Sequence, residues 1–277
     1  MPFQPHATIG ESVTQALIVA CHEDIRPLQQ ALQGQGFAVE VIRRDYSAEE
    51  LLMPRAIRAL LNHSLAWQHV VDRDRPAIVV EADFVPCRRL AARAMPYADG
   101  IAEPKLAFLY AAGPVIYHAD SSGGYYGHAC GAVAYLLEPE AARHWLDLLA
   151  EQRQQSTFGS YLQWDVGMFV DLRRRKGVRL YLTQKCYGEH GGETNPEHGQ
   201  QGFRGWHQAD ALVAPLEFLP AYARGSRLRY ALIRVRSRMR YVYKFARGRY
   251  FDTWANFWTL KPDRSGKLSF ALRRVFG

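Results

Sequence analysis

The chain has 277 residues, 48% of them apolar, which excludes a disordered protein and predicts one large α/β domain, alone or with an appendage. It holds no run of about 18 or more uncharged apolar residues and no basic-then-apolar N-terminal order, so neither a membrane-spanning helix nor a secretory signal is expected. The four cysteines are far apart and lack C-x-x-C spacing, which favours reduced thiols in a cytosolic protein over disulfides or a zinc site.

The net charge of +8 is unevenly distributed along the chain. Residues 221–277 carry 15 Lys and Arg against 2 Asp, a balance of +13, so residues 1–220 carry −5. The basic character therefore belongs to the C-terminal segment, and we expect no nucleic-acid partner for the body of the chain. We accordingly divide the chain into a main domain, 1–220, and a basic segment, 221–277.

The N-terminal part predicts a β-α-β order. Strands are expected at residues 15–21 and 37–42, with a helix at 23–32 between them. This order suggests the start of a Rossmann-like sheet, although no G-x-G-x-x-G motif follows the first strand. Ser47 and Glu50 form a capping-box pattern, a longer helix is expected at 54–71, and the apolar run at 77–80 predicts a buried central strand.

The second half alternates in the same way. A strand and a turn are expected at 107–117, strands at 132–137 and 178–182, and helices at 140–149 and 163–174. The glycine-rich segment 120–127 is a loop, either a lid over a site or a plain surface loop. Residues 187–207 are rich in Gly, His and Glu, and long loops of this kind often carry function.

The buried strand at 77–80 runs into two carboxylates, Glu81 and Asp83. Because side chains alternate along a strand, residues two apart point the same way. Two carboxylates on one side of a strand end can share a divalent cation with a diphosphate, which suggests a nucleotide-sugar enzyme. The alternative is a pair of solvated acids at a turn.

Several segments in order carry a family resemblance. They are Asn-His-Ser-Leu-Ala-Trp at 62–67, Val-Val-Glu-Ala-Asp at 79–83, Gly-Ala-Val-Ala-Tyr-Leu-Leu at 131–137 followed by Pro-Glu-Ala-Ala at 139–142, and Trp-Asp at 164–165. Together, over roughly residues 50–190, they resemble glycosyltransferase family 25, the lipopolysaccharide-biosynthesis transferases. The sequence departs from that pattern at His63-Ser64, which are reversed, at Ala82, which replaces the middle acid, and in the opening strand.

The resemblance implies a GT-A-like, Rossmann-type mixed sheet flanked by helices. It implies transfer from a nucleotide-sugar donor, such as UDP-galactose or another UDP-hexose, to a saccharide acceptor of lipopolysaccharide or another cell-surface glycan. It also implies Mn²⁺ or Mg²⁺ as cofactor, held by the two carboxylates that remain beside Ala82. A degenerate, non-catalytic transferase-like binding module stays open as the alternative.

The resemblance and the residues name further site candidates. His63 is expected to contact the donor phosphate or to order the Glu81 loop, or else to be a buried helix histidine, while Trp67 is expected in the core. Asp165 is the candidate general base, with a helix N-cap as the alternative. His190 is expected to complete the cation site and Glu189 to be a second base candidate, unless their segment is a structured surface loop.

The basic segment carries ten Lys and Arg and no acid between residues 224 and 249. On a helical wheel one apolar stripe emerges, formed by Leu228, Ala231, Leu232, Val235, Met239, Val242 and Ala246. A basic amphipathic helix of this kind binds anionic lipid, with Trp254, Phe257 and Trp258 as interfacial anchors. We therefore expect a cytoplasmic protein, peripheral on the inner face of the membrane and acting on a lipid-linked acceptor. Two alternatives are a strand at 233–240 and docking of the stripe on the main domain.

Overall fold

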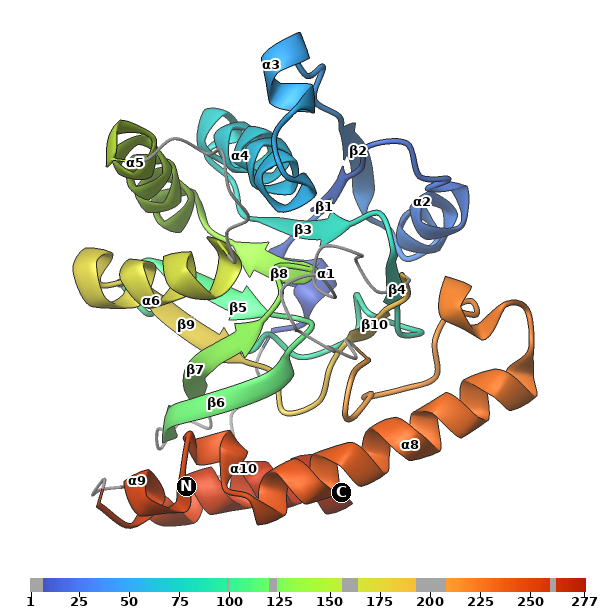
Figure 1. Ribbon diagram of the computed structural model, residues 1–277, viewed down its shortest axis with the longest axis vertical. Helices are drawn as coiled ribbons and strands as arrows, with labels where there is room; N and C mark the ends of the chain where they lie inside the picture. The colour runs from blue at the N-terminus through green and yellow to red at the C-terminus, as the bar shows by residue number, and fades with distance from the viewer. Residues whose placement is uncertain (1–6, 99, 120–123, 156–163, 193–207, 260–262) are drawn as a thin grey trace.

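The computed structural model describes residues 7–98, 100–119, 124–155, 164–192, 208–259 and 263–277, and its central feature is an eight-stranded mixed sheet (Figure 1). The strand order is β2-β1-β3-β8-β5-β9-β7-β6. The bounds are β1 Gln15–Val19, β2 Ala38–Ile42, β3 Ala77–Glu81, β5 Lys105–Phe108, β6 Ala112–Ala119, β7 Tyr125–Cys130, β8 Ala134–Leu137 and β9 Arg179–Leu182. A separate antiparallel pair joins β4, Phe84–Pro86, to β10, Gly188–His190.

Helices cover both faces and one edge of the sheet. They are α1 Ile9–Ser12, α2 Arg26–Gln33, α3 Ala48–Leu51, α4 Arg55–Arg73, α5 Pro139–Gln155, α6 Trp164–Lys176, α8 Arg227–Ala246, α9 Trp254–Thr259 and α10 Arg264–Phe276, with 3₁₀ turns η1 Ala221–Ala223 and η2 Arg249–Phe251. The described part of the chain has no helix long and apolar enough to cross a membrane.

The first three strands are parallel, and their connections pass over opposite faces of the sheet. Between β1 and β2, α2 packs Leu28 and Leu32 into one core cluster, whereas α4, which precedes β3, packs Leu60 and Trp67 into the other. The carboxyl ends of β1 and β3 therefore form a topological switch point. Open α/β sheets bind ligands in the crevice at such a point.

The core consists of two layers separated by the sheet. In β3, Ala77 and Val79 face the cluster under α4, α5 and α6, while Ile78 and Val80 face the other cluster, so the strand is buried on both sides. On the α4 side the Trp67 ring stacks on Trp145 of α5, with centroids 4.2 Å apart. This stacking confirms the expectation that Trp67 is a core residue.

The C-terminal helices pack on the far edge of the sheet. Figure 1 shows α8 running beyond β6, with α10 beside it. Arg274 of α10 is fully buried and binds both carboxylate oxygens of Asp210, at 2.6 and 2.7 Å. Tyr241 and Phe270 belong to the same core cluster as Trp67. Residues 221–277 thus share the hydrophobic core of the main domain.

The structure confirms the α/β class and the mixed sheet flanked by helices. The strand interpretation of 233–240 is wrong, because these residues lie inside α8, whose first turn is capped by Ser226. Part of the predicted loop at 120–127 is strand, since β7 begins at Tyr125, while 120–123 lie outside the described residues. The segment 187–207 contributes β10, and 193–207 likewise lie outside.

Candidate functional site

A small cavity lies at the switch point between β1 and β3. It has a volume of about 130 Å³ and is lined by Val19, Ala20, Cys21, Glu23, Ala59, Asn62, His63, Glu81, Ala82 and Asp83. Asn62 of α4 closes its base, because its buried side-chain amide donates to the carbonyl of Ala20 at 2.8 Å. The cavity therefore sits where the topology of the sheet favours a ligand.

Three residues from two distant segments meet beside this cavity. Glu81 ends β3, Asp83 follows in the turn to β4, and His190 ends β10. Because β10 pairs with β4, His190 opposite Phe84, the histidine is brought back to the turn that holds Asp83. One ligand atom from each of Glu81, Asp83 and His190 lies within 4.8 Å of the others, and His190 Nε2 lies 3.1 Å from Asp83 Oδ2. The expected cation group is thus assembled, without a contribution from Ala82.

The donor set of this cluster suits a divalent cation. Two carboxylates and one imidazole supply oxygen and nitrogen ligands, a combination that Mn²⁺ accepts readily and Mg²⁺ less so. The chain passes close to Asp83 at Gly192, because a Cβ atom on Gly192 would lie 2.1 Å from Asp83 Oδ2. The three ligand side chains thus fit a metal ion, and a side chain at position 192 would force the Asp83 carboxylate to shift.

In the absence of a metal, His190 is itself the cation of the cluster. Burial lowers the pKa of its imidazole, but the charge of Asp83, their hydrogen bond and the charge of Glu81 outweigh burial and raise the pKa to about 9. His190 is therefore protonated at neutral pH and bridges the acids electrostatically. A metal ion at the same place would replace that proton.

His63 of α4 holds Glu81 through a hydrogen bond. It is fully buried, its Nε2 lies 3.2 Å from Glu81 Oε1 and its Nδ1 lies 2.9 Å from the hydroxyl of Tyr135. The same hydroxyl accepts a hydrogen bond from Trp67 Nε1 at 2.8 Å. Since a carboxylate only accepts, His63 donates from Nε2 and its neutral form accepts from Tyr135. Both ring nitrogens of His63 are engaged in hydrogen bonds within the protein. His63 therefore orders Glu81, which is one of the two expected roles, and has no ring nitrogen left to contact the phosphate of a nucleotide-sugar donor.

Asp165 stands in the first turn of α6, where the charge of Glu81 acts on its carboxyl group. Its Oδ2 accepts from the backbone N–H of Gly131 at 2.8 Å, and its neighbour Trp164 packs against His63 with ring centroids 5.3 Å apart. Burial raises the pKa of Asp165 above its usual range and the charge of Glu81 adds to this, although hydrogen bonds from the backbone oppose the shift. The carboxylate is thus close enough to the cluster to share its electrostatics.

The structure separates Glu189 from the cluster. Glu189 precedes His190 in β10, so its side chain leaves the strand on the other side. The buried carboxylate accepts from the backbone of Ala209 at 2.6 Å and from Arg234 of α8 at 2.8 Å. Burial raises its pKa to about 7, with Arg234 opposing. Glu189 therefore ties α8 to the β4–β10 pair, and the expectation that it is a second base has no geometric support.

The polar side of α8, and not its apolar stripe, faces the protein. Arg234 binds Glu189, and Ser237 donates to the carbonyl of Ala209 at 3.0 Å. On the outer side Leu232 and Met239 are 63% and 69% exposed, and Leu228 and Val235 are exposed as well. Docking of the stripe on the main domain is thus wrong.

The expected aromatic anchors of the C-terminal segment are only partly exposed. Phe257 is buried and packs on Phe251, with ring centroids 4.6 Å apart, and Trp254 is half-buried beside them. Trp258 alone of the three is largely exposed. Only one of the three predicted anchors therefore faces solvent.

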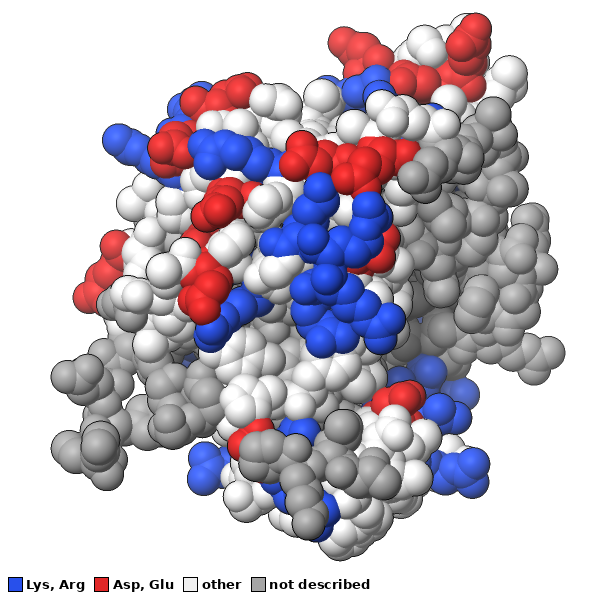
Figure 2. Space-filling view, turned by 90° about the vertical axis from the view of Figure 1, so that its left-hand side faces the viewer, with Lys and Arg blue, Asp and Glu red and all other residues white. Residues whose placement is uncertain are grey.

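Basic side chains on the face of α5 and α6 are interspersed with acids (Figure 2). The last turn of α6 carries Arg173, Arg174, Arg175 and Lys176. Of these, Arg175 and Lys176 form ion pairs with Glu151 of α5. Arg173 instead lies over the Tyr117 ring, 4.3 Å from its centroid, so acids pair with two of these four cations.

Sequence reasoning missed the role of Tyr135. It stands in the segment at 131–137, and its burial between a tryptophan and a histidine has no signal in a pattern of apolar spacing. Comparison of the chain with protein-family models gives no match, and comparison with curated proteins gives none either.

Proposed function

We propose that the chain is a metal-dependent glycosyltransferase of the GT-A type, similar to family 25. It would transfer a hexose from a nucleotide-sugar donor such as UDP-galactose to a saccharide acceptor of a cell-surface glycan, lipopolysaccharide being the example the resemblance suggests. The observation that carries the proposal is the grouping of Glu81, Asp83 and His190 beside a cavity at the switch point of the sheet. This arrangement suits a cation and the diphosphate of a donor.

The proposed roles divide the site into binding and proton transfer. Glu81, Asp83 and His190 would hold Mn²⁺ or Mg²⁺, which when bound offsets charge on the leaving diphosphate. His63 and Tyr135 keep Glu81 in place through the hydrogen bonds that join the three residues. The position of the donor diphosphate then follows from the fixed carboxylates.

Asp165 is the proposed general base of an inverting transfer. A base must accept the proton of the acceptor hydroxyl as its oxygen attacks the anomeric carbon. Asp165 lies beside the cluster, and burial raises its pKa, which makes its carboxylate a better proton acceptor. Glu189, held by Arg234, serves as its control.

Attachment to a membrane through α8 is part of the proposal. The exposed stripe of Leu228, Leu232, Val235 and Met239 on a helix with many arginines is an amphipathic surface of the kind that lies on anionic lipid. Attachment to the bilayer would bring the site close to a lipid-linked acceptor embedded in it.

Transfer of hexose from UDP-sugars, measured with Mn²⁺ and with EDTA, tests the proposal. We expect Asp83→Asn and Asp165→Asn each to lower kcat/KM by about 10²-fold or more. Glu189→Gln should leave kcat/KM within about threefold, because its carboxylate lies outside the cluster. Full activity of Asp83→Asn would refute the metal assignment, and full activity of Asp165→Asn would refute the base. Should no nucleotide sugar bind, the chain would be the non-catalytic module instead.

A further inference from the structure

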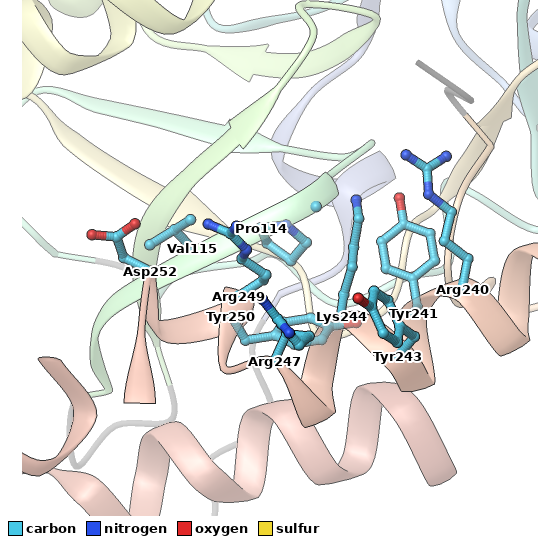
Figure 3. Close-up of a pocket in the computed structure, with 11 residues that line it drawn as sticks. Pro114, Val115, Arg240, Tyr241, Tyr243, Lys244, Arg247, Arg249, Tyr250 and Asp252 are labelled. Carbon is cyan, nitrogen blue, oxygen red and sulfur yellow. The ribbon is translucent and has the colours of Figure 1, made fainter. Parts of the chain in front are cut away.

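A second, larger cavity lies at the β6 edge of the sheet, between β6, α8 and η2 (Figure 3). Its volume is about 460 Å³, and its lining is Gly113, Pro114, Val115, Arg240, Tyr241, Tyr243, Lys244, Arg247, Arg249, Tyr250 and Asp252. Four of these side chains are cationic and one is a carboxylate. Nothing in the proposed transfer reaction uses this cavity.

The cations converge on the cavity without an acid to neutralise them all. Figure 3 shows Lys244 extending from α8 toward the strand that holds Pro114. Among the described residues no carboxylate forms an ion pair with Lys244, Arg247 or Arg249. Gly113 makes room for the ammonium, because a Cβ there would lie 3.2 Å from Lys244 Nζ. Arg240 and Lys244 are half-buried and Arg247 and Arg249 are exposed, and such a group of positive charges with open space beside it favours an anion.

Two of the three tyrosines that line the cavity direct their hydroxyls elsewhere. Tyr250 donates to Asp210 at 2.8 Å, and Tyr241 donates to the carbonyl of Gln208 at 3.3 Å. The Lys244 ammonium lies 4.5 Å from the Tyr241 ring centroid. The walls are therefore aromatic, and Lys244, Arg247 and Arg249 present positive charge to the cavity without a carboxylate partner among the described residues.

The cavity adjoins the exposed apolar stripe of α8. Met239 and Tyr243 are four residues apart and lie one above the other on the outer side of the helix, both largely exposed. Arg240, Lys244 and Arg247 follow the i, i+4, i+7 spacing of the neighbouring row. A row of apolar side chains thus runs along a row of cations. On a membrane surface the apolar row can enter the acyl region while the cations contact the lipid phosphates.

The same cavity is close to the proposed base. Ala112, next to Gly113 in the cavity wall, pairs with Cys130, and the following residue, Gly131, binds Asp165. A headgroup held in the cavity would therefore lie near the side of the sheet where an acceptor must reach Asp165.

We propose that the cavity of Arg240, Lys244, Arg247 and Arg249 binds the phosphate of an anionic membrane lipid while the adjoining stripe of α8 rests in the bilayer. Charge complementarity and the adjacency of the two rows support a lipid phosphate over a free one. The inference deepens the proposed membrane attachment and is independent of transferase activity.

Flotation of the full chain with vesicles of phosphatidylcholine, with and without phosphatidate, tests the proposal. The variant pair Arg240→Gln with Lys244→Gln removes two cavity charges, and the pair Arg229→Gln with Arg236→Gln removes two charges from the same helix outside the cavity lining. We expect the cavity pair to lower the partition coefficient on phosphatidate vesicles at least tenfold more than the control pair. Equal losses would show diffuse attraction and overturn the site.

Two further arms separate the sources of phosphate. Inorganic pyrophosphate should release the wild-type chain from phosphatidate vesicles more than sodium chloride of equal ionic strength. If the cavity pair abolishes pyrophosphate binding but leaves vesicle binding unchanged, the ligand is a soluble phosphate and the lipid assignment is wrong. Where the cavity pair melts at a lower temperature than wild type, Arg247→Gln with Arg249→Gln, both at exposed residues, replaces it.

The stripe is tested separately by Leu232→Gln with Met239→Gln. This pair should weaken binding to all vesicles, whereas the cavity pair should remove only the preference for phosphatidate. If the stripe pair loses the preference for phosphatidate while the cavity pair keeps it, the cavity assignment is contradicted. Wild-type binding that ignores phosphatidate would refute it as well.

Discussion

His190 Nε2 lies 3.1 Å from Asp83 Oδ2, although the two residues belong to distant parts of the chain. The short β4–β10 pair creates this contact and completes a group of three metal-ligand side chains with Glu81. A histidine with a raised pKa keeps the two acids together until a cation arrives.

The first prediction concerns metal affinity. His190→Asn should weaken Mn²⁺ binding at least tenfold, because it removes a ligand of the cluster, while His144→Asn on α5 should leave it unchanged. Wild-type affinity should rise with pH up to about pH 9, since the metal must displace the His190 proton. Isothermal titration in buffers of different ionisation enthalpy measures both affinity and proton release. Binding that releases no proton at pH 7.5 would argue against His190 as a ligand.

The second prediction concerns stability in the absence of metal. The folded pKa of His190 is raised from 6.5 to about 9, so its contribution is fully present below pH 6.5 and is lost as pH rises through 9. The full shift corresponds to about 3 kcal/mol as an upper value. Urea unfolding in EDTA between pH 7 and 9.5 measures this loss.

His190→Asn is the control for that experiment and should show a flatter stability profile over the same range. Glu189 acts in a lower window, because its pKa of about 7 lies above the ordinary 4.5 and its contribution is lost between those values. A wild-type profile as flat as that of the variant would contradict the raised pKa of His190.

The third prediction concerns the close approach of the chain at Gly192. Gly192→Ala should displace the Asp83 carboxylate, since the added Cβ would lie 2.1 Å from its Oδ2, and should weaken Mn²⁺ binding at least tenfold. Gly167→Ala is the matched control, because nothing lies within 4 Å of its Cβ position in α6. That change should raise stability by about 0.5–1 kcal/mol. Equal metal affinity in the two variants would show that Mn²⁺ binding does not depend on the close approach of the backbone at Gly192 to Asp83.

The fourth prediction concerns the C-terminal segment. Arg274→Met leaves the buried Asp210 carboxylate without its cation and should lower the free energy of unfolding by about 3–5 kcal/mol. Arg273→Met, at the exposed neighbour, should change it by less than about 0.5 kcal/mol. Urea denaturation compares the two. Similar values would mean that α10 is a loose appendage, whereas the expected contrast means that α10 is part of the folded core.

The regular parts of the fold follow from local patterns in the sequence. The apolar run of β3 and the helical spacing in α4 predict those elements closely, because burial on one or two faces fixes their periodicity. The pair β4 and β10 has three residues in each strand, too short for a period to show, and only tertiary pairing defines it.

The candidate site, like the fold, was predictable where a local pattern exists and not where tertiary contacts define it. Glu81 and Asp83 stand at a strand end that the pattern identifies, and their approach to His190 was expected from a resemblance alone. That Glu189 faces away from the cluster depends on side-chain alternation in β10, and its partner Arg234 comes from a helix far along the chain. A pattern of types and spacings carries no information on such a partner.

The binding of a UDP-hexose to the full chain, with Mn²⁺ and with EDTA, is the most direct test of the central claim. Titration calorimetry on wild type and Asp83→Asn should show binding to wild type with Mn²⁺ and a loss of at least tenfold in affinity with EDTA or in the variant. Equal affinity under all these conditions, or no binding of any nucleotide sugar to wild type with Mn²⁺, would contradict a metal-dependent donor site at Glu81, Asp83 and His190.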